Sequence, residues 1–474
     1  MGCGAGGAGG GAGWKAGIGA SIGRTKGGTV RTIPPWKGFG NMCLWRGDAL
    51  HGHHPNGTAI HSNLDGQTMH RASNRFGMLP AVCLLMAGCR TAPIAQPNTP
   101  PTALQAGVSE QLAPLASPVG SARLPEQLPD SIWWRMIQEF SEPGGYFRSE
   151  NFVSNELGLQ HVVARLRLTA PPGSVYLGVG PEQNFTYIAA LEPRIAFIVD
   201  IRRQNLLQHL WYKAVFELSP TRAEFLARLF ARPLAAGSTP STTWRADSLI
   251  ARLMRTPMDT VYFRRTYAEV EAHLIRGRGI PLDSSDRATL RYIDGVFANS
   301  GPELNYSSGS TLGGGFGRGG FRRMPSFAEV AEATDQAGEN LGFLGTERAY
   351  QRVRDMQRRN LIVPVVGNFA GPHALQRVGT WLRERDARVQ VFYTSNVEQY
   401  LFQQGDEWAR FYANVAAMPV DTAARFIRSV TGGFGVARSQ FMMTQLTSPI
   451  LPILQASADG TLGGYGDVIR RSEP

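Results

Sequence analysis

From about residue 129 onward, short apolar runs alternate with longer segments of mixed polarity. The runs lie at 174–177, 194–199, 361–366 and 389–393, and each is followed by a glycine or a polar residue. Continuous apolar runs of this length are typical of strands that are buried on both faces of a parallel sheet. The alternation of such strands with helical segments predicts an α/β domain with a doubly wound, mostly parallel sheet.

Helical patterns fill the intervals between these runs. Apolar residues three and four positions apart predict helices at 131–140, from Pro181, at 203–218, from Ser219 or Thr221, and at 346–360, 372–385, 407–417 and 421–430. The chain after Phe441 is expected to add one or two final strands. Pro364 lies inside one strand run and cannot donate to a sheet ladder, so we expect a bulge there.

The segment 231–345 separates the second strand run from the run at 361–366, which we take as the fourth strand. It predicts a helical insertion with one strand at 260–263 and a Gly/Ser-rich loop at 300–325. That loop has the spacing G-x-G-x-x-G at Gly315–Gly320, but no strand precedes it, so the structural context for phosphate binding is missing. We interpret it as a surface loop or lid.

The first 129 residues have a different composition. Residues 1–68 are Gly-rich without periodicity, which predicts a disordered segment or an over-extended translation start. Residues 69–89 begin with basic residues, continue with an apolar stretch and end in Leu85-Met86-Ala87-Gly88-Cys89. This layout is typical of a secretory signal and resembles a bacterial lipoprotein signal. Residues 90–129 are rich in proline and predict an extended tether.

The lipoprotein resemblance implies that Cys89 is lipidated and becomes the first residue of the mature protein. Acyl chains would then hold a periplasm-facing protein to a membrane of the cell envelope. No run of about 18 apolar residues occurs, so we expect no membrane-spanning helix. The alternative is that the signal is spurious and the protein is cytoplasmic.

Most of the net charge of +11 lies outside the predicted domain. Residues 1–88 have a net charge of +6, whereas the remaining 386 residues have only +5. Because the folded part is nearly balanced, we do not expect a nucleic-acid partner. All four cysteines precede residue 90 and the later histidines are widely spaced, so we expect no metal site and no thiol chemistry in the domain. P-loop, H-E-x-x-H and G-x-S-x-G motifs are also absent from the sequence.

Glycines and polar residues follow the predicted strands. Gly178 and Gly180 follow the first strand, Asp200 and Arg202 the second, and Asn368 the run at 361–366. Ligands of open α/β sheets bind beyond the carboxyl ends of the strands, so these residues predict a pocket for a small molecule or nucleotide. Asp200 lies 22 residues after Gly178, an interval at which a carboxylate can accept hydrogen bonds from ribose hydroxyls.

The run Val175–Gly180 followed by Asp200 resembles the first two motifs of class I S-adenosylmethionine-dependent methyltransferases. Stretches between residues 130 and 440 also resemble an uncharacterised bacterial family with this Rossmann-like core. The resemblance implies a methyltransferase-like sheet that binds S-adenosylmethionine through Gly178, Gly180, Glu182, Asp200, Arg202 and Asn368. Two departures stand out: Glu182 occupies the position of the third glycine, and no acidic residue ends the first strand.

Methyl transfer depends mainly on positioning, and a base is needed only where the acceptor loses a proton. Glu398 and Tyr393 are the candidates for that base, and the alternative is that they form a hydrogen-bonded cluster that fixes the following helix. Two functions remain open. One is a methyltransferase with an unknown acceptor, and the other is a non-catalytic, membrane-anchored lipoprotein that binds a small ligand or a protein. They conflict because S-adenosylmethionine is a cytoplasmic cofactor.

Overall fold

The computed structural model describes residues 124–235, 242–306, 308, 324–431 and 443–474. The chain divides into two units, 1–91 and 92–474, and every described residue belongs to the second. The predictions for residues 1–68, for the signal at 69–89 with Cys89, for nearly all of the tether and for Gly315–Gly320 therefore lie outside the described residues.

In the described part of the chain, six strands form one sheet in the order β3-β2-β1-β4-β5-β6. The first five strands of this order are parallel, and β6 runs antiparallel to β5. The strands are β1 (Val175–Gly178), β2 (Ile195–Asp200), β3 (Ile362–Val366), β4 (Val389–Ser395), β5 (Val420–Thr431) and β6 (Met443–Pro449). The mostly parallel α/β sheet predicted from the sequence is thus confirmed.

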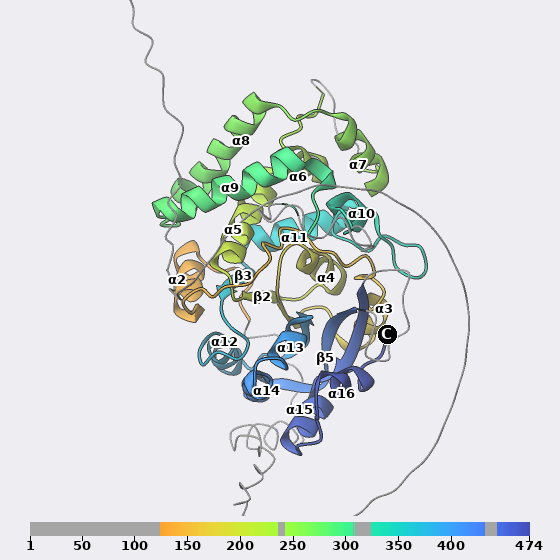
Figure 1. Ribbon diagram of the computed structural model, residues 1–474. Helices are drawn as coiled ribbons and strands as arrows, with labels where there is room; N and C mark the ends of the chain where they lie inside the picture. Colours follow the sequence, from red (N-terminus) through yellow and green to blue (C-terminus); the bar gives the residue numbers. More distant parts are fainter. Residues whose placement is uncertain (1–123, 236–241, 307, 309–323, 432–442) are drawn as a thin grey trace, which may run out of the picture. The chain divides into compact units, whose positions relative to one another are not determined.

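Helices cover both faces of the sheet (Figure 1). On one face lie α4 (Gln183–Leu191), α5 (Arg203–Leu218) and α11 (Glu347–Arg358). The other face carries α2 (Asp130–Phe140), α12 (Ala374–Arg383), α14 (Glu407–Ala416) and α15 (Ile450–Ala458). Because β2 has helices on both sides, all six of its residues are buried.

Between β2 and β3 the chain adds a further helical layer over α5, at the top of Figure 1. It contains α6 (Arg222–Leu229), α7 (Ala246–Arg255), α8 (Thr260–Ala272), the π-helical turn η2 (His273–Gly277), α9 (Ser284–Ser300), the short 3₁₀ turn η3 (Gly301–Glu303) and α10 (Phe327–Glu332). The remaining described helices are α3 (Val163–Thr169), α13 (Val397–Leu401) and α16 (Tyr465–Arg470). Within the described ranges, no helix is long and apolar enough to cross a membrane.

Two elements differ from the sequence prediction. Residues 260–263 are the first turn of α8 and not a strand, because Asp259 caps this helix by accepting from the backbone N–H groups of Val261 and Tyr262. Residues 421–430 belong to β5 and not to a helix. Buried Arg428 interrupts the apolar run of this strand, and pairing with β4 and β6 outweighs the local helical pattern.

The run at 361–366 is the third strand, β3, and not the fourth. It lies at the edge of the sheet and pairs only with β2, with Pro364 opposite Ile198 and no shift of register along the pair. An edge strand tolerates proline because one side of it makes no ladder bonds. The predicted bulge is therefore wrong.

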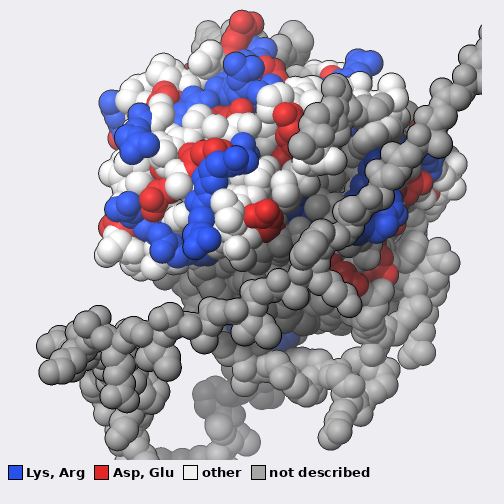
Figure 2. Space-filling model, turned by 90° about the horizontal axis from the view of Figure 1, so that it is seen from above, with Lys and Arg blue, Asp and Glu red and all other residues white. Residues whose placement is uncertain are grey.

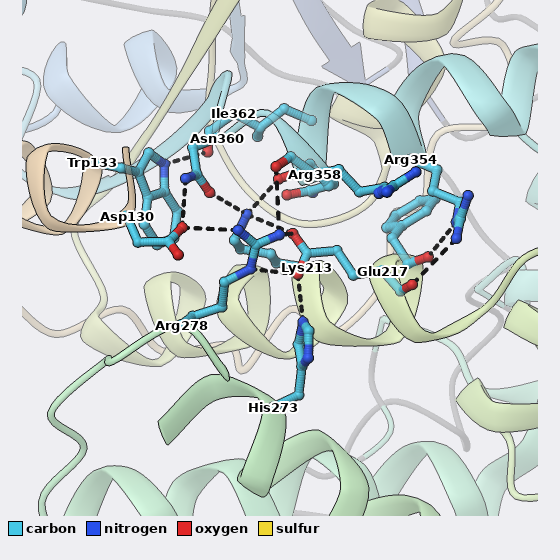
Figure 3. A network of polar contacts seen from close by, with 12 residues as sticks. Asp130, Trp133, Lys213, Glu217, His273, Arg278, Arg354, Arg358, Asn360 and Ile362 are labelled. Atoms are coloured by element: carbon cyan, nitrogen blue, oxygen red, sulfur yellow. Dashed lines mark hydrogen bonds and ion pairs between the residues drawn. The ribbon is translucent and has the colours of Figure 1, made fainter. Parts of the chain in front are cut away.

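A buried polar cluster joins α2, α5 and η2 to the start of β3 (Figure 3). Lys213 on α5 donates to Asn360 Oδ1 over 2.6 Å, and its Nζ lies 2.8 Å from Glu217 Oε1. Arg278 also contacts the Glu217 carboxylate, at 2.7 Å and 2.9 Å, and donates to Asp130 over 2.8 Å. These contacts fix α5 against the sheet, and with it the turn at which α5 begins.

Candidate functional site

A cavity of about 460 Å³ lies at the carboxyl ends of β1 to β4. The chain first builds the sheet outward from β1 to β3 and then returns to place β4 on the other side of β1, so this edge contains the topological switch point. Open α/β sheets bind their ligands at such a point. The strand ends contribute Val179, Gly180, Asp200–Arg202, Gly367–Phe369 and Ser395–Val397 to the wall, and residues between Tyr146 and Glu156 contribute another side.

The turn after β1 is held by Asn184 on α4. The Asn184 side-chain amide donates to the carbonyls of Val179, Gly180 and Pro181, and its Oδ1 accepts from the Tyr176 hydroxyl. A Cβ on Gly178 would lie 2.0 Å from Asn184 Oδ1, so this glycine makes room for Asn184 and is not on the cavity wall. Gly180 has a φ of +80° and lines the cavity.

Asp200 and Arg202 line the cavity as a closed ion pair. Asp200 Oδ1 accepts from the Arg202 backbone N–H over 2.9 Å and from Nε over 3.1 Å, and Oδ2 accepts from Nη2 over 3.1 Å. Arg202 also donates to the carbonyls of Ser149 and Glu150, which fixes that segment at the cavity. A carboxylate offers about four lone-pair sites, so Asp200 retains room for one further donor.

Asn368 follows β3 and also lines the cavity. Its Oδ1 accepts from the backbone N–H of Ala370 over 3.0 Å, and its own N–H donates to Glu142 Oε2 over 3.1 Å. Because β3 lies at the edge of the sheet, Asn368 is two strands away from β1. The strand beside β1 is β4, which ends in Ser395.

Glu156 is a cavity residue that the sequence did not indicate. Its Oε1 accepts from Tyr393 Oη over 2.7 Å and from Ser395 Oγ over 2.9 Å, and its Oε2 accepts from Gln445 Nε2 over 3.2 Å. Burial raises the pKa of Glu156, which the hydrogen bonds from these donors partly offset. Glu156 lies in irregular chain before β1, where no motif or periodicity marks it.

The remaining predicted site residues do not line this cavity. Tyr393 is buried and reaches the cavity only through Glu156 and Gln183. Glu398 is buried beneath β5, where its carboxylate accepts from Arg428, Tyr412 and Thr394. Glu182 lines a second, small cavity of about 20 Å³ on the other side of Gln183.

Aromatic side chains surround the outer part of the cavity. The rings of Phe147 and Tyr400 meet edge to face at 5.5 Å, and the Arg148 guanidinium lies 5.9 Å from the Tyr400 ring centre. Tyr306 also lines the wall, and Tyr146 is 85% exposed there. Flat aromatic faces of this kind suit stacking on a planar ligand group.

Two further observations bear on chemistry. Within the ranges that the structure describes, no group of three or more His, Cys, Asp or Glu side chains is placed to hold a metal ion. On the face that carries α7, α8 and α9, basic and acidic side chains are interspersed (Figure 2). Ion pairs such as Arg228 with Glu269 and Arg287 with Glu271 account for part of this mixture.

The fold and cavity define an α/β protein with a ligand-type pocket at the switch point of a mostly parallel sheet. The sequence matches the model of a domain of unknown function, DUF7790, over residues 151–236 and 322–449. These two segments carry all six strands and most of the cavity wall, whereas α7, α8 and α9 lie between them. No curated protein sequence matches the chain.

Proposed function

We propose that the cavity binds an adenosine-type ligand, with S-adenosylmethionine as the candidate, and that the domain is methyltransferase-like. The supporting observation is the position of the cavity at the switch point, with Gly180 after β1 and the Asp200 carboxylate after β2 on its wall. An antiparallel last strand next to a parallel sheet also occurs in doubly wound folds.

The residues present are compatible with such a ligand. The volume of about 460 Å³ falls within the range of small-molecule sites. Asp200 would accept a ribose hydroxyl with its remaining lone pair, and the aromatic rings would face the base. When bound, S-adenosylmethionine would supply a transferable methyl group on a sulfonium. Glu156 is a carboxylate on the cavity wall that could take a proton from an acceptor. Glu398 and Tyr393, the bases expected from the sequence, do not line the cavity.

Calorimetry on the full chain with S-adenosylmethionine and S-adenosylhomocysteine tests this proposal. We expect a dissociation constant below about 1 mM, within the usual range for enzyme ligands. Asp200→Asn should weaken binding, and Asp459→Asn, which changes an exposed carboxylate elsewhere, should not. Absence of binding by the wild-type protein at millimolar ligand would overturn the proposal.

We also propose, as the alternative, a non-catalytic ligand-binding lipoprotein anchored through Cys89. The observation that favours it is the closed Asp200–Arg202 ion pair, together with the finding that neither predicted base, Glu398 or Tyr393, lines the cavity. Incorporation of radiolabelled palmitate tests the anchor. Retention of the label after Cys89→Ala would refute lipidation at that residue, and fractionation of cells would place the protein in the envelope or the cytoplasm.

A further inference from the structure

Two buried carboxylates lie at the inner side of the cavity, Glu156 on its wall and Glu182 on the other side of Gln183. Ser154, which lines the cavity, contacts both residues: its backbone N–H donates to Glu182 Oε1 over 2.9 Å, and its Oγ accepts from the backbone N–H of Glu156 over 3.2 Å. Glu156 and Glu182 are each only 2% exposed. Burial raises the pKa of Glu182, and the negative charge of Glu156 raises it further.

Neither carboxylate has a cationic partner among the described residues. The donors to Glu156 are three hydroxyls and an amide, all neutral, and the donors to Glu182 are backbone N–H groups. Arg202 forms an ion pair with Asp200. Burial lowers the pKa of nearby His209 to about 4, so this side chain is neutral near pH 7. Buried charges in proteins are normally paired.

Unpartnered side-chain oxygens also lie on the wall of this cavity and behind it. Glu182 Oε2, Gln183 Oε1 and Gln445 Oε1 are buried and have no hydrogen-bond partner within the described part of the chain. Gln183 Oε1 is an acceptor on the wall of the large cavity, whereas Glu182 and Gln445 do not line it. Gln183 is 5% exposed, so its unpartnered oxygen is well shielded from solvent. A ligand group that carries both hydrogen-bond donors and a positive charge would complement Gln183 Oε1 and Glu156 on the cavity wall.

We propose that the cavity takes a second ligand group, a protonated amine, seated against Glu156. An ammonium has three N–H donors, no acceptor and a single positive charge, which matches the unpartnered Gln183 Oε1 beside a carboxylate that has no cationic partner. An ammonium has no free lone pair, so the amine would first have to give a proton to Glu156. The neutral amine would then be the group on which a methyltransferase of the proposed kind acts. This inference rests on the proposed ligand cavity but does not depend on which cofactor, if any, occupies the Asp200 side.

A matched pair of small probes tests the inference on the full chain. Benzylammonium and benzyl alcohol have the same ring and differ in the charged group, so calorimetry of both near neutral pH isolates the charge. We expect benzylammonium to bind about tenfold or more tightly than the alcohol, as a charge-assisted hydrogen bond predicts. Glu156→Gln should abolish this preference, whereas Glu339→Gln, at an exposed carboxylate, should leave it unchanged.

If Glu156→Gln does not fold, the wild-type protein still decides the question through a third probe, benzoate. The affinities must fall in the order amine, alcohol, carboxylate; any other order, or no binding of the amine at tens of millimolar, overturns the inference. Binding of S-adenosylhomocysteine is measured on the same samples. If S-adenosylhomocysteine binds and benzylammonium does not, the proposed function is supported and the amine site is refuted. If benzylammonium binds and S-adenosylhomocysteine does not, the amine site is supported and the proposed cofactor is refuted.

Discussion

The Tyr393 hydroxyl donates a hydrogen bond of 2.7 Å to Glu156 Oε1, which links the buried end of β4 to the cavity wall. The same hydroxyl accepts from Gln183 Nε2 over 3.1 Å. Tyr393 therefore touches two residues that line the cavity without lining it. Its effect on a ligand must pass through the orientation of Glu156 and Gln183.

Tyr393→Phe should weaken amine binding and destabilise the fold. It removes one of the donors to Glu156 and one of the two acceptors of Gln183 Nε2, and the loss of such buried hydrogen bonds costs about 1–3 kcal/mol. Urea unfolding measures the stability, and calorimetry with benzylammonium measures the binding. Tyr187→Phe is the matched control, because the Tyr187 ring packs 5.2 Å from that of Tyr393 while its hydroxyl has no partner among the described residues. Equal effects of the two substitutions would contradict the role given to the Tyr393 hydroxyl.

The sequence could predict the parts of this site that follow strands. Gly180, Asp200 and Asn368 each lie within three residues of the end of an apolar run, and parallel strands bring such positions to one edge. It could not indicate Glu156, whose significance depends on Tyr393 and Gln445, 237 and 289 residues further along the chain. Contacts at that separation leave no local pattern.

The burial of Glu398 away from the cavity could not be predicted for a related reason. Its place after a strand end favoured a role in the pocket, but its partner Arg428 lies on β5, which the local pattern predicted as a helix. The sequence does not show that Arg428 is buried in the sheet. It therefore could not predict the ion pair between Arg428 and Glu398. The positions of β3 and β4 in the sheet could not be predicted for the same reason, because the pairing of strands depends on contacts between residues far apart in the chain.

Arg428→Met should destabilise the protein by about 3–5 kcal/mol, because it leaves Glu398 as an unpaired charge in the core. The double variant Arg428→Met with Glu398→Leu should recover much of this loss, since it removes both charges. Chemical denaturation of both single variants and the double variant measures the coupling. Because the pair does not line the cavity, binding of benzylammonium by the folded single variant should be unchanged. Additive losses in the double variant would show that the pair does not act as a unit.

Glu217 should support the fold only above acidic pH. Burial raises the pKa of Glu217, but His273, Lys213 and Arg278 more than offset this effect and hold the pKa at about 2, below its ordinary value of 4.5. Stability from Glu217 is therefore fully present above about pH 4.5 and is lost as pH falls toward 2, by at most about 3 kcal/mol. Denaturation across this range should show a shallower fall for Glu217→Gln, which starts from a lower stability, than for the wild type. Glu339→Gln should follow the wild-type slope, and a parallel slope for Glu217→Gln would contradict the prediction.

Glu182 should have the opposite pH dependence. Burial raises its pKa from 4.5 to about 7, so between these values the folded protein holds a proton that the unfolded chain releases. Stability from this group therefore falls as pH rises from about 4.5 to 7, and the full cost of the buried charge is present above pH 7.

Glu182→Gln retains the acceptor for the Ser154 N–H but cannot ionise. Relative to the wild type, this variant should gain stability as pH rises from about 5 to 8, by up to about 3 kcal/mol. Glu156 and Asp294, whose pKa values burial also raises, are present in both proteins, so their contributions largely cancel in the difference. Urea denaturation of both proteins at several pH values gives this difference directly. If the stability difference between the two proteins stays constant with pH, Glu182 is already ionised in the folded protein. A positive charge outside the described residues would then have to stabilise its carboxylate.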